Sequence, residues 1–305
     1  MEKEQENSYH KINLNWYPGH MAKTKKQIAE DLKLVDVVIE ILDSRIPISS
    51  QNPDIAKVIQ GKKKIIILNK CDISDEKQNK LWVKYFENKG IPAVLTDSNS
   101  GKGIEEVIRK IENVMKEDLE KKAAKGRIGS KIKAMIIGIP NVGKSSFINR
   151  IAKKNSANVG NKPGVTKQKQ WIRVNEKIEL LDTPGVLWPK FESEKVALNL
   201  AFTGTIKDDI MERVEIAYYL TKFLIENYRQ NLCERYKIEE SYIEETLRKD
   251  QPENENIYEI MLTIGKKRGA IVSGGSIDEE KTARIIIDDF RNQKLGKITL
   301  EICKE

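Results

Sequence analysis

Cysteine is scarce in this chain, which has three among 305 residues. Cys71, Cys233 and Cys303 lie far apart and form no CxxC pair, so neither a disulfide framework nor a zinc site is indicated. The sequence also lacks an apolar run of about 18 residues, and its polar amino terminus, MEKEQENSYHK, has no signal-peptide core. We therefore expect a cytoplasmic protein that is not secreted and does not span a membrane.

Acidic residues are outnumbered by basic ones, 46 Asp and Glu against 54 Lys and Arg, which gives a net charge of +8. This excess favours polyanionic partners, although a solvated lysine-rich surface is the alternative. The length of 305 residues fits two domains, and 39% hydrophobic residues can fill two ordinary cores. No internal repeat or low-complexity tract is visible.

Apolar runs that end in turn residues alternate with helical patterns through the first two thirds of the chain. The runs that predict strands occupy residues 35–47, 63–72, 91–103, 132–146 and 177–185. This alternation predicts an α/β domain with a mostly parallel, doubly wound sheet over residues 1–205. Helical periodicity then dominates, so we expect a small all-helical domain over residues 206–305.

The string GIPNVGKS, residues 138–145, matches a phosphate-binding P-loop between an apolar strand and a helical pattern. Its glycines allow backbone N–H groups to surround phosphate, Lys144 supplies a charge to the outer phosphates, and Ser145 offers a hydroxyl to Mg²⁺. The residues predicted to bind nucleotide here are Asn141, Val142, Gly143, Lys144, Ser145 and Ser146.

A second phosphate motif, DTPG, ends the last predicted strand. Asp182 can hold Mg²⁺ through water, and the Gly185 N–H can meet a γ-phosphate. Between the two motifs, Thr166 in NKPGVTK can ligate the metal once a γ-phosphate is present, as in GTPase switches. Taken alone, DTPG would be a common turn and Thr166 an ordinary loop threonine.

The string NKCD, residues 69–72, follows a strand of consecutive apolar residues. Asp72 can accept hydrogen bonds from the ring N–H and amino group of guanine, Asn69 can meet the other edge, and the Lys70 stem can cover the ring. Adenine would leave the Asp72 carboxylate unpaired, so GTP is favoured over ATP. Ser98 and Asn99, in SNSGKG, can cap the base with backbone N–H groups.

The order of these motifs is unusual. NKCD and SNSGKG precede GIPNVGKSS, PGVTK and DTPG, whereas in an ordinary small GTPase the last three come first. Residues 104–131 are long enough to join the original termini, so the fold class is a circularly permuted P-loop GTPase domain. The segment after DTPG then leads directly into the helical domain, which suggests a lever that responds to the γ-phosphate.

Several strings together carry a family resemblance, with the amino- and carboxyl-terminal ones more specific than the nucleotide motifs. They are WYPGHMAK at 16–23, DSRIP at 43–47, NKCD, GIPNVGKSS, PGVTK, DTPGVLWPK and the stretch 268–301. From about residue 13 to 301 the chain resembles the ribosome biogenesis GTPase A family, the circularly permuted GTPases of the YlqF type. The resemblance implies a GTPase that binds a late precursor of the large (50S) ribosomal subunit, helps it mature and is stimulated by it.

The resemblance also implies catalytic roles for His20, Lys144, Thr166 and Gly185. Val186 stands where most GTPases place a glutamine that orients water, so intrinsic hydrolysis should be slow. By resemblance, Asn141 ligates a K⁺ ion in place of an arginine finger and His20 positions the water. The alternatives are a loop-stabilising asparagine and a histidine that caps a helix or contacts phosphate.

The carboxyl-terminal domain should contact ribosomal RNA through basic side chains, unless these form a merely solvated face. The candidates are Lys266, Lys267, Arg268, Arg284, Arg291, Lys294 and Lys297. We expect a monomer without DNA or membrane partners. A rival hypothesis is a nucleotide-gated RNA-binding scaffold with negligible turnover, and a GTPase acting on tRNA is disfavoured because no reactive cysteine motif is present.

Overall fold

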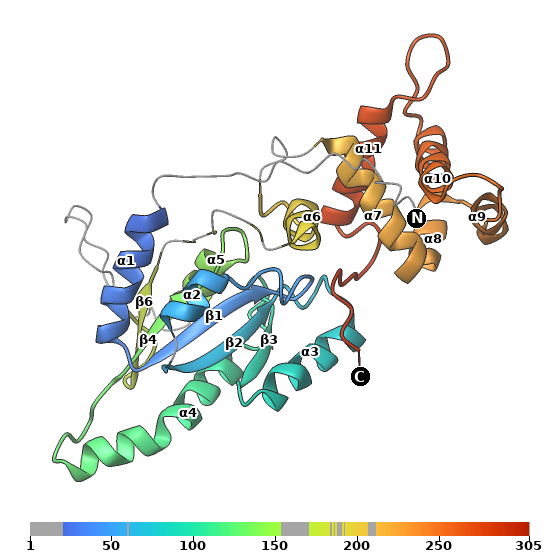
Figure 1. Ribbon diagram of the computed structural model, residues 1–305. Coiled ribbons are helices and arrows are strands. Elements are labelled where there is room, and N and C mark those ends of the chain that lie inside the picture. Colours follow the sequence, from blue (N-terminus) through green and yellow to red (C-terminus); the bar gives the residue numbers. More distant parts are fainter. Residues whose placement is uncertain are drawn as a thin grey trace, which may run out of the picture.

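A six-stranded sheet forms the centre of the first part of the chain in the computed structural model (Figure 1). The structure describes residues 21–59, 61–153, 171–183, 185, 187, 191, 193–206 and 212–304. The strands are β1 (Val37–Asp43), β2 (Lys63–Asn69), β3 (Ala93–Thr96), β4 (Ile132–Ile137), β5 (Trp171–Arg173) and β6 (Ile178–Asp182). Their order in the sheet is β3-β2-β1-β4-β6-β5.

All neighbouring strands are parallel except β5 and β6, which are antiparallel. The five strands predicted from the sequence are therefore confirmed, as is the mostly parallel sheet. β5 was not predicted, because three residues with one basic side chain carry too little apolar pattern. β4, the strand before the P-loop, lies between β1 and β6 although it comes fourth in the chain, as the circular permutation requires.

Helices cover both faces of the sheet, because each central strand is apolar on both sides. Alternate residues of β1 belong to two cores: Ile39 packs in the cluster that includes α4 and α5, and Val38 in the cluster that includes α1 and α2. The helices of this part are α1 (Met21–Asp31), the 3-10 turn η1 (Leu32–Leu34), α2 (Pro53–Val58), α3 (Glu76–Asn88), α4 (Ile104–Ala124) and α5 (Lys144–Lys153).

The long helix α4 makes the connection that the permutation needs. It spans 21 residues and joins the edge strand β3 to the central strand β4. Ile104, Val107, Ile111 and Met115 bury one side of its first three turns against the sheet, while its last turns carry Lys121 and Lys122. The predicted join over residues 104–131 is thus a helix with one buried side, followed by a short exposed segment.

The remainder of the chain is helical, as predicted. Its helices are α6 (Glu194–Phe202), α7 (Arg213–Asn227), α8 (Arg229–Tyr236), α9 (Glu240–Leu247), α10 (Glu253–Lys267) and α11 (Glu279–Arg291). The apolar core passes without a break from the sheet through Leu200 of α6 to Leu220 of α7 and Ile286 of α11. The domain boundary after residue 205 stays a prediction. None of the described helices is long and apolar enough to cross a membrane.

The segment after α11 returns to the sheet and ends beside α3 (Figure 1). The Glu301 carboxylate, 7% exposed, accepts hydrogen bonds from the backbone N–H groups of Ile48 at 2.5 Å and Ser49 at 2.8 Å. The Ser49 hydroxyl and the Asn199 amide of α6 donate to the same carboxylate. Trp82 of α3 donates its indole N–H to the Glu301 carbonyl. One side chain therefore joins the tail, α6 and the loop after β1.

Replacement of Glu301 by glutamine should destabilise the fold. The new amide nitrogen would face N–H donors, so at least one buried donor would lose its acceptor, at a cost of about 1–3 kcal/mol. The free energy of unfolding from urea titration measures the effect. Glu245→Gln, at an exposed position of α9, is the matched control and should change stability by less than about 0.5 kcal/mol. Equal stabilities of the two variants would contradict this role of Glu301.

Candidate functional site

Asn69, the last residue of β2, brings three of the predicted motifs together. Its side chain is 2% exposed. The amide nitrogen donates to the Val142 carbonyl of the P-loop at 2.8 Å. The amide oxygen accepts from the Thr96 hydroxyl at 3.1 Å and from both the backbone N–H and the hydroxyl of Ser98, at 3.1 and 2.7 Å. NKCD, SNSGKG and the P-loop therefore lie at one edge of the sheet.

The P-loop leads from β4 into α5 by a backbone path that requires a glycine. Gly143 has φ +94°, and a Cβ atom there would lie 2.3 Å from the Asn69 amide nitrogen. α5 begins at Lys144, with the exposed side chains of Ser145 and Ser146 in its first turn. The unpaired N–H groups of such a helix start attract phosphate.

Lys144, Asp182 and Gly185, which were predicted to face the phosphates, lie close together. Burial lowers the pKa of Lys144, and the nearby Asp182 carboxylate opposes this shift. Burial likewise raises the pKa of Asp182, which Lys144 counteracts. A Cβ on Gly185 would lie 2.7 Å from the Lys144 ammonium and 3.1 Å from the Pro140 nitrogen, so DTPG faces the P-loop directly.

The residues here suit a Mg²⁺ ion that is shared with a nucleotide. Within the described part of the chain, no three His, Cys, Asp or Glu side chains gather into a metal site of their own. Ser145 and Asp182 supply one hydroxyl and one carboxylate, and Mg²⁺ commonly keeps several waters and takes phosphate oxygens. Ser145 and Asp182 would therefore hold Mg²⁺ only together with bound phosphate.

Asp72, which was predicted to bind the base, is half-buried beside the end of β2. Burial raises the pKa of its carboxyl, and Asp97 adds to this, while Arg45 and Lys297 act in the opposite direction. Lys70 has φ 63°, a left-handed conformation that is uncommon outside glycine. Its ammonium donates to Asp43 at 2.8 Å.

The loop of SNSGKG is held in a tight turn. The Asn99 N–H donates to Asp97 at 2.8 Å, and the Asn99 carbonyl accepts from the Arg150 guanidinium of α5. A Cβ on Gly101 would lie 2.9 Å from the same guanidinium. The helix that starts at the P-loop therefore also supports the loop that is predicted to cap the base.

Asn141 has a contact that the sequence did not suggest. Its amide nitrogen donates to the Gly204 carbonyl at 3.0 Å, in the turn that follows α6. The P-loop is thereby joined to the beginning of the helical part. The predicted roles of His20, Thr166 and Val186 fall outside the described residues.

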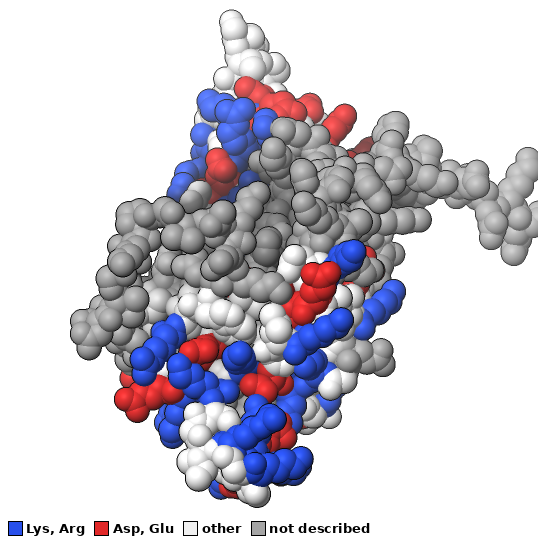
Figure 2. Space-filling view, turned by 90° about the vertical axis from the view of Figure 1, so that its left-hand side faces the viewer, with Lys and Arg blue, Asp and Glu red and all other residues white. Residues whose placement is uncertain are grey.

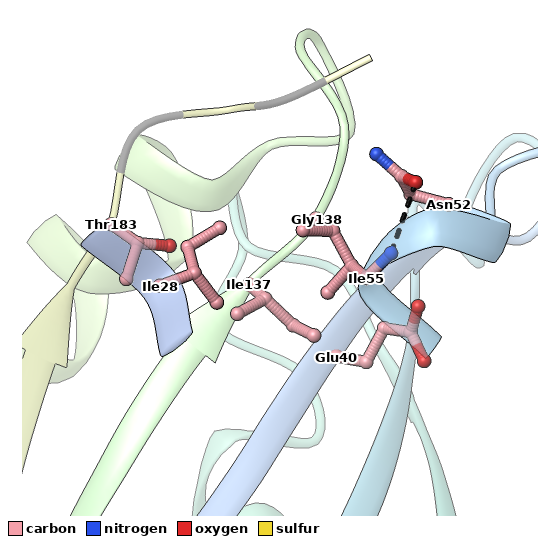
Figure 3. Close-up of a pocket in the computed structure, with 7 residues that line it drawn as sticks. All are labelled: Ile28, Glu40, Asn52, Ile55, Ile137, Gly138 and Thr183. Carbon is pink, nitrogen blue, oxygen red and sulfur yellow. Dashed lines mark hydrogen bonds between the residues drawn. The ribbon is translucent and has the colours of Figure 1, made fainter. Parts of the chain in front are cut away.

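A small cavity lies under the P-loop, among α1, α2, β1 and β4 (Figure 3). Ile28, Ile137 and Gly138 line it together with Thr183 of DTPG. Its volume of about 10 Å³ is room for one water molecule at most. The cavity is therefore a packing gap beside α1 and is too small to hold a nucleotide.

Replacement of Gly143 by alanine should weaken nucleotide binding. The added Cβ would displace the Asn69 amide and strain a left-handed backbone, so we expect at least a tenfold loss of affinity for fluorescent GDP, about 1.4 kcal/mol. Gly126→Ala is the control, because Gly126 also has a left-handed φ, +80°, with no atom near its Cβ position. It should bind GDP like the wild type. Equal affinities for all three proteins would contradict the close fit at Gly143.

Comparison with known proteins agrees with this geometry. The family model described as "50S ribosome-binding GTPase" matches residues 133–262. The match begins in β4, just before the P-loop, and leaves out β1 to β3. A linear family model would behave in this way with a permuted chain, since NKCD and SNSGKG precede the P-loop here.

Relatives match nearly the whole chain. "Ribosome biogenesis GTPase A" of Bacillus cereus is 44% identical over 96% of this chain and 95% of its own length, and that of Bacillus pumilus is 46% identical over 95% and 99%. The crystal structure of GNP-bound YlqF from T. maritima superposes with a TM-score of 0.59, at 26% identity, over 93% of this chain and 99% of that one. Such identity over almost the full length confirms the family suggested by the motifs: the chain belongs to the ribosome biogenesis GTPase A family and is a GTPase.

Proposed function

We propose that this GTPase assists late maturation of the large ribosomal subunit in the cytoplasm, and that the ribosomal particle stimulates its slow hydrolysis of GTP. The names of the relatives and of the family model support a ribosomal partner. The observation that carries the nucleotide part is the Asn69 side chain, which joins NKCD, SNSGKG and the P-loop.

Guanine is recognised, in this proposal, by the NKCD residues at the mouth of the site. The Asp72 carboxylate accepts two hydrogen bonds from the base, and the Lys70 stem covers the ring. The Asn69 amide nitrogen has a second hydrogen beyond the one that it gives to Val142, and this hydrogen can reach the base. Ser98 and Asn99 supply the backbone around the base from the neighbouring strand end.

On the phosphate side, Lys144 neutralises the outer phosphates, and Mg²⁺ is held by Ser145, Thr166 and, through water, Asp182. The Gly185 N–H meets the γ-phosphate. When bound, Mg²⁺ polarises the phosphate oxygens. Because Val186 cannot orient water, we propose that His20 does so when the ribosomal particle is bound.

A K⁺ ion is proposed beside the P-loop, held by Asn141. The amide nitrogen of Asn141 is used by Gly204, which turns the amide oxygen away from that contact. This oxygen accepts no hydrogen bond from the residues that the structure describes, and it is therefore available to a cation. Positive charge at this place would offset the charge that develops during phosphoryl transfer.

The RNA contact is proposed at the end of α10 and the start of α11. Lys266, Lys267, Arg268 and Arg284 are exposed, and none of them forms a side-chain hydrogen bond or ion pair with a described residue. The other three candidates have partners within the protein, since Arg291 donates to the Ala201 carbonyl, Lys294 pairs with Asp289, and Lys297 pairs with Glu76.

Basic residues outside these seven candidates give less support to an RNA-binding surface. Among the described residues on the face that Figure 2 shows, Lys and Arg are interspersed with Asp and Glu, so these residues form no broad field of one sign there. Phosphate binding depends on clustered positive charge. The four unpaired basic residues of α10 and α11 are therefore the preferred site, and we propose a monomer that binds ribosomal RNA but not DNA.

Measurement of phosphate release tests the proposed function. GTP turnover should be slow for the protein alone and should rise at least tenfold with immature large subunits in K⁺ buffer, and less in Na⁺ buffer. ATP should not be hydrolysed. Unchanged turnover with the particle, together with nucleotide-dependent binding to it, would favour the rival scaffold function. Absence of any binding to the particle at low salt would contradict the proposed partner.

Replacement of Asp72 by asparagine tests the recognition of guanine. Loss of a charged acceptor should lower the affinity for GTP about 10- to 100-fold. Xanthosine triphosphate carries a carbonyl in place of the guanine amino group, so the new amide should bind it better than the wild type does. Asp288→Asn, on the exposed side of α11, should change neither affinity. Undiminished GTP affinity in Asp72→Asn would contradict the role of Asp72.

A further inference from the structure

Two buried charged residues lie next to the NKCD segment, residues 69–72, which we call the guanine loop. They have no part in the proposed mechanism. Asp43 ends β1 and is 1% exposed, and Arg45, two residues later, is 4% exposed. The Arg45 guanidinium donates to both carboxylate oxygens of Asp43, at 3.0 and 2.8 Å. The Lys70 ammonium donates to the second of these oxygens at 2.8 Å. The two cations hold the pKa of Asp43 well below its usual range, against the effect of burial.

The position of Asp43 follows from the sheet. In the register of β1 and β2, Asp43 pairs with Asn69, the residue directly before Lys70. Strand ends in a parallel sheet meet at the edge where ligands bind. The pairing of the two strands is therefore sufficient to place Asp43 next to the guanine loop.

A purely structural role explains this cluster poorly. Burial of charge is costly, and a buried ion pair contributes little net stability in comparison with apolar side chains. The pairing of Asp43 with Arg45 is local in the chain, and the Arg45 backbone N–H donates to the same carboxylate at 3.0 Å, so this part of the cluster closes the turn after β1. The contact that crosses between strand ends goes to Lys70, whose backbone is left-handed at φ 63°. Such strain is typical of functional loops.

Arg45 has further neighbours that belong to the site and to the helical part. Its charge lowers the pKa of Asp72, so it lies close to the carboxylate that is proposed to bind guanine. Its guanidinium is 5.6 Å from the centre of the Phe290 ring of α11. Its carbonyl accepts the Leu300 N–H of the tail at 2.8 Å. Arg45 is thus buried and contacted from several sides, which favours a fixed position beside Asp43.

We propose that Asp43 and Arg45 are positioning residues for guanine recognition: Asp43 anchors the Lys70 ammonium so that its stem is in place to cover the base, and Arg45 holds Asp43. This inference rests on the proposed binding of guanine by the NKCD residues. Lys70 has four rotatable side-chain bonds, and an anchored ammonium loses less freedom when the base binds. Without the anchor, the affinity for the base falls while the phosphate site is unaffected.

The test compares binding of GDP with binding of inorganic pyrophosphate, which has no base. The main variant is Asp43→Asn combined with Arg45→Met, because Asp43→Asn alone would leave Arg45 buried without a counter-charge and could unfold the protein. We expect about a tenfold loss of GDP affinity and less than a twofold change for pyrophosphate. A general disturbance of the fold would lower both affinities together and leave their ratio unchanged.

Lys70→Met is the second variant, which keeps an unbranched stem and removes the ammonium while the pair of Asp43 and Arg45 stays intact. It should lose about as much GDP affinity as the main variant. The triple variant should lose no more than either, because all the changes abolish the same contact, that of the Lys70 ammonium with the Asp43 carboxylate. Losses that multiply in the triple variant would overturn the proposal.

The structure offers a matched control pair across the same two strands. Lys64 and Glu40 form an ion pair of 2.9 Å, with the Glu40 side chain 3% exposed. Glu40→Gln combined with Lys64→Met should leave both GDP and pyrophosphate affinities within twofold of the wild type. A loss of GDP affinity equal to that of the main variant would overturn the proposal, as would wild-type GDP affinity in the main variant.

The outcome also separates this inference from the proposed function. If the wild type binds ADP as tightly as GDP, the proposed recognition of guanine fails, and the inference fails with it. If the wild type prefers GDP and the ratio of GDP to pyrophosphate affinity is unchanged in the main variant, only the positioning role of Asp43 and Arg45 fails.

Discussion

The nucleotide site depends on the buried amide of Asn69. Parallel strand pairing brings three loops to one edge of the sheet, and this side chain joins them, since it donates to Val142 and accepts from Thr96 and Ser98. Each of these groups is buried or partly buried, and an unpaired polar group in such a place is costly. The same contact restricts Gly143 to glycine, since a Cβ would collide with the amide. The NKCD and SNSGKG segments are therefore joined directly to the P-loop by hydrogen bonds.

Sequence reasoning reached the sheet, the motif order and the permutation, because consecutive apolar residues and glycine-rich turns express local rules. It could not find Glu301, whose carboxylate accepts four hydrogen bonds from residues about 100 and 250 positions away. Asp43 and Arg45 could be noticed in the sequence, since DSR stands at the end of a buried strand. Their contact with Lys70, however, depends on the register of β1 with β2. Arg150 looked like an ordinary helix residue, and its support of Asn99 depends on packing.

The contacts of the basic carboxyl-terminal residues also could not be predicted from the sequence. Charge can be counted from sequence, but whether a cation is available depends on its neighbours. Arg291 would be a plausible phosphate ligand by composition, yet its guanidinium donates to the carbonyls of Ala201 and Phe202 at the end of α6. Such a contact at a helix carboxyl end satisfies carbonyls that lack partners within the helix.

These contacts give physical content to the lever suggested by the motif order. Asn141 in the P-loop donates to Gly204, directly after α6, and Arg291 of α11 holds the end of the same helix. Glu301 holds Asn199, also in α6, from the tail. α6 and the turn after it are therefore hydrogen-bonded to the P-loop, to α11 and to the tail. If nucleotide binding shifts the P-loop, either the Gly204 contact breaks or α6 moves with it. In that case thermodynamic linkage requires that a partner which moves α6 also changes the affinity for nucleotide.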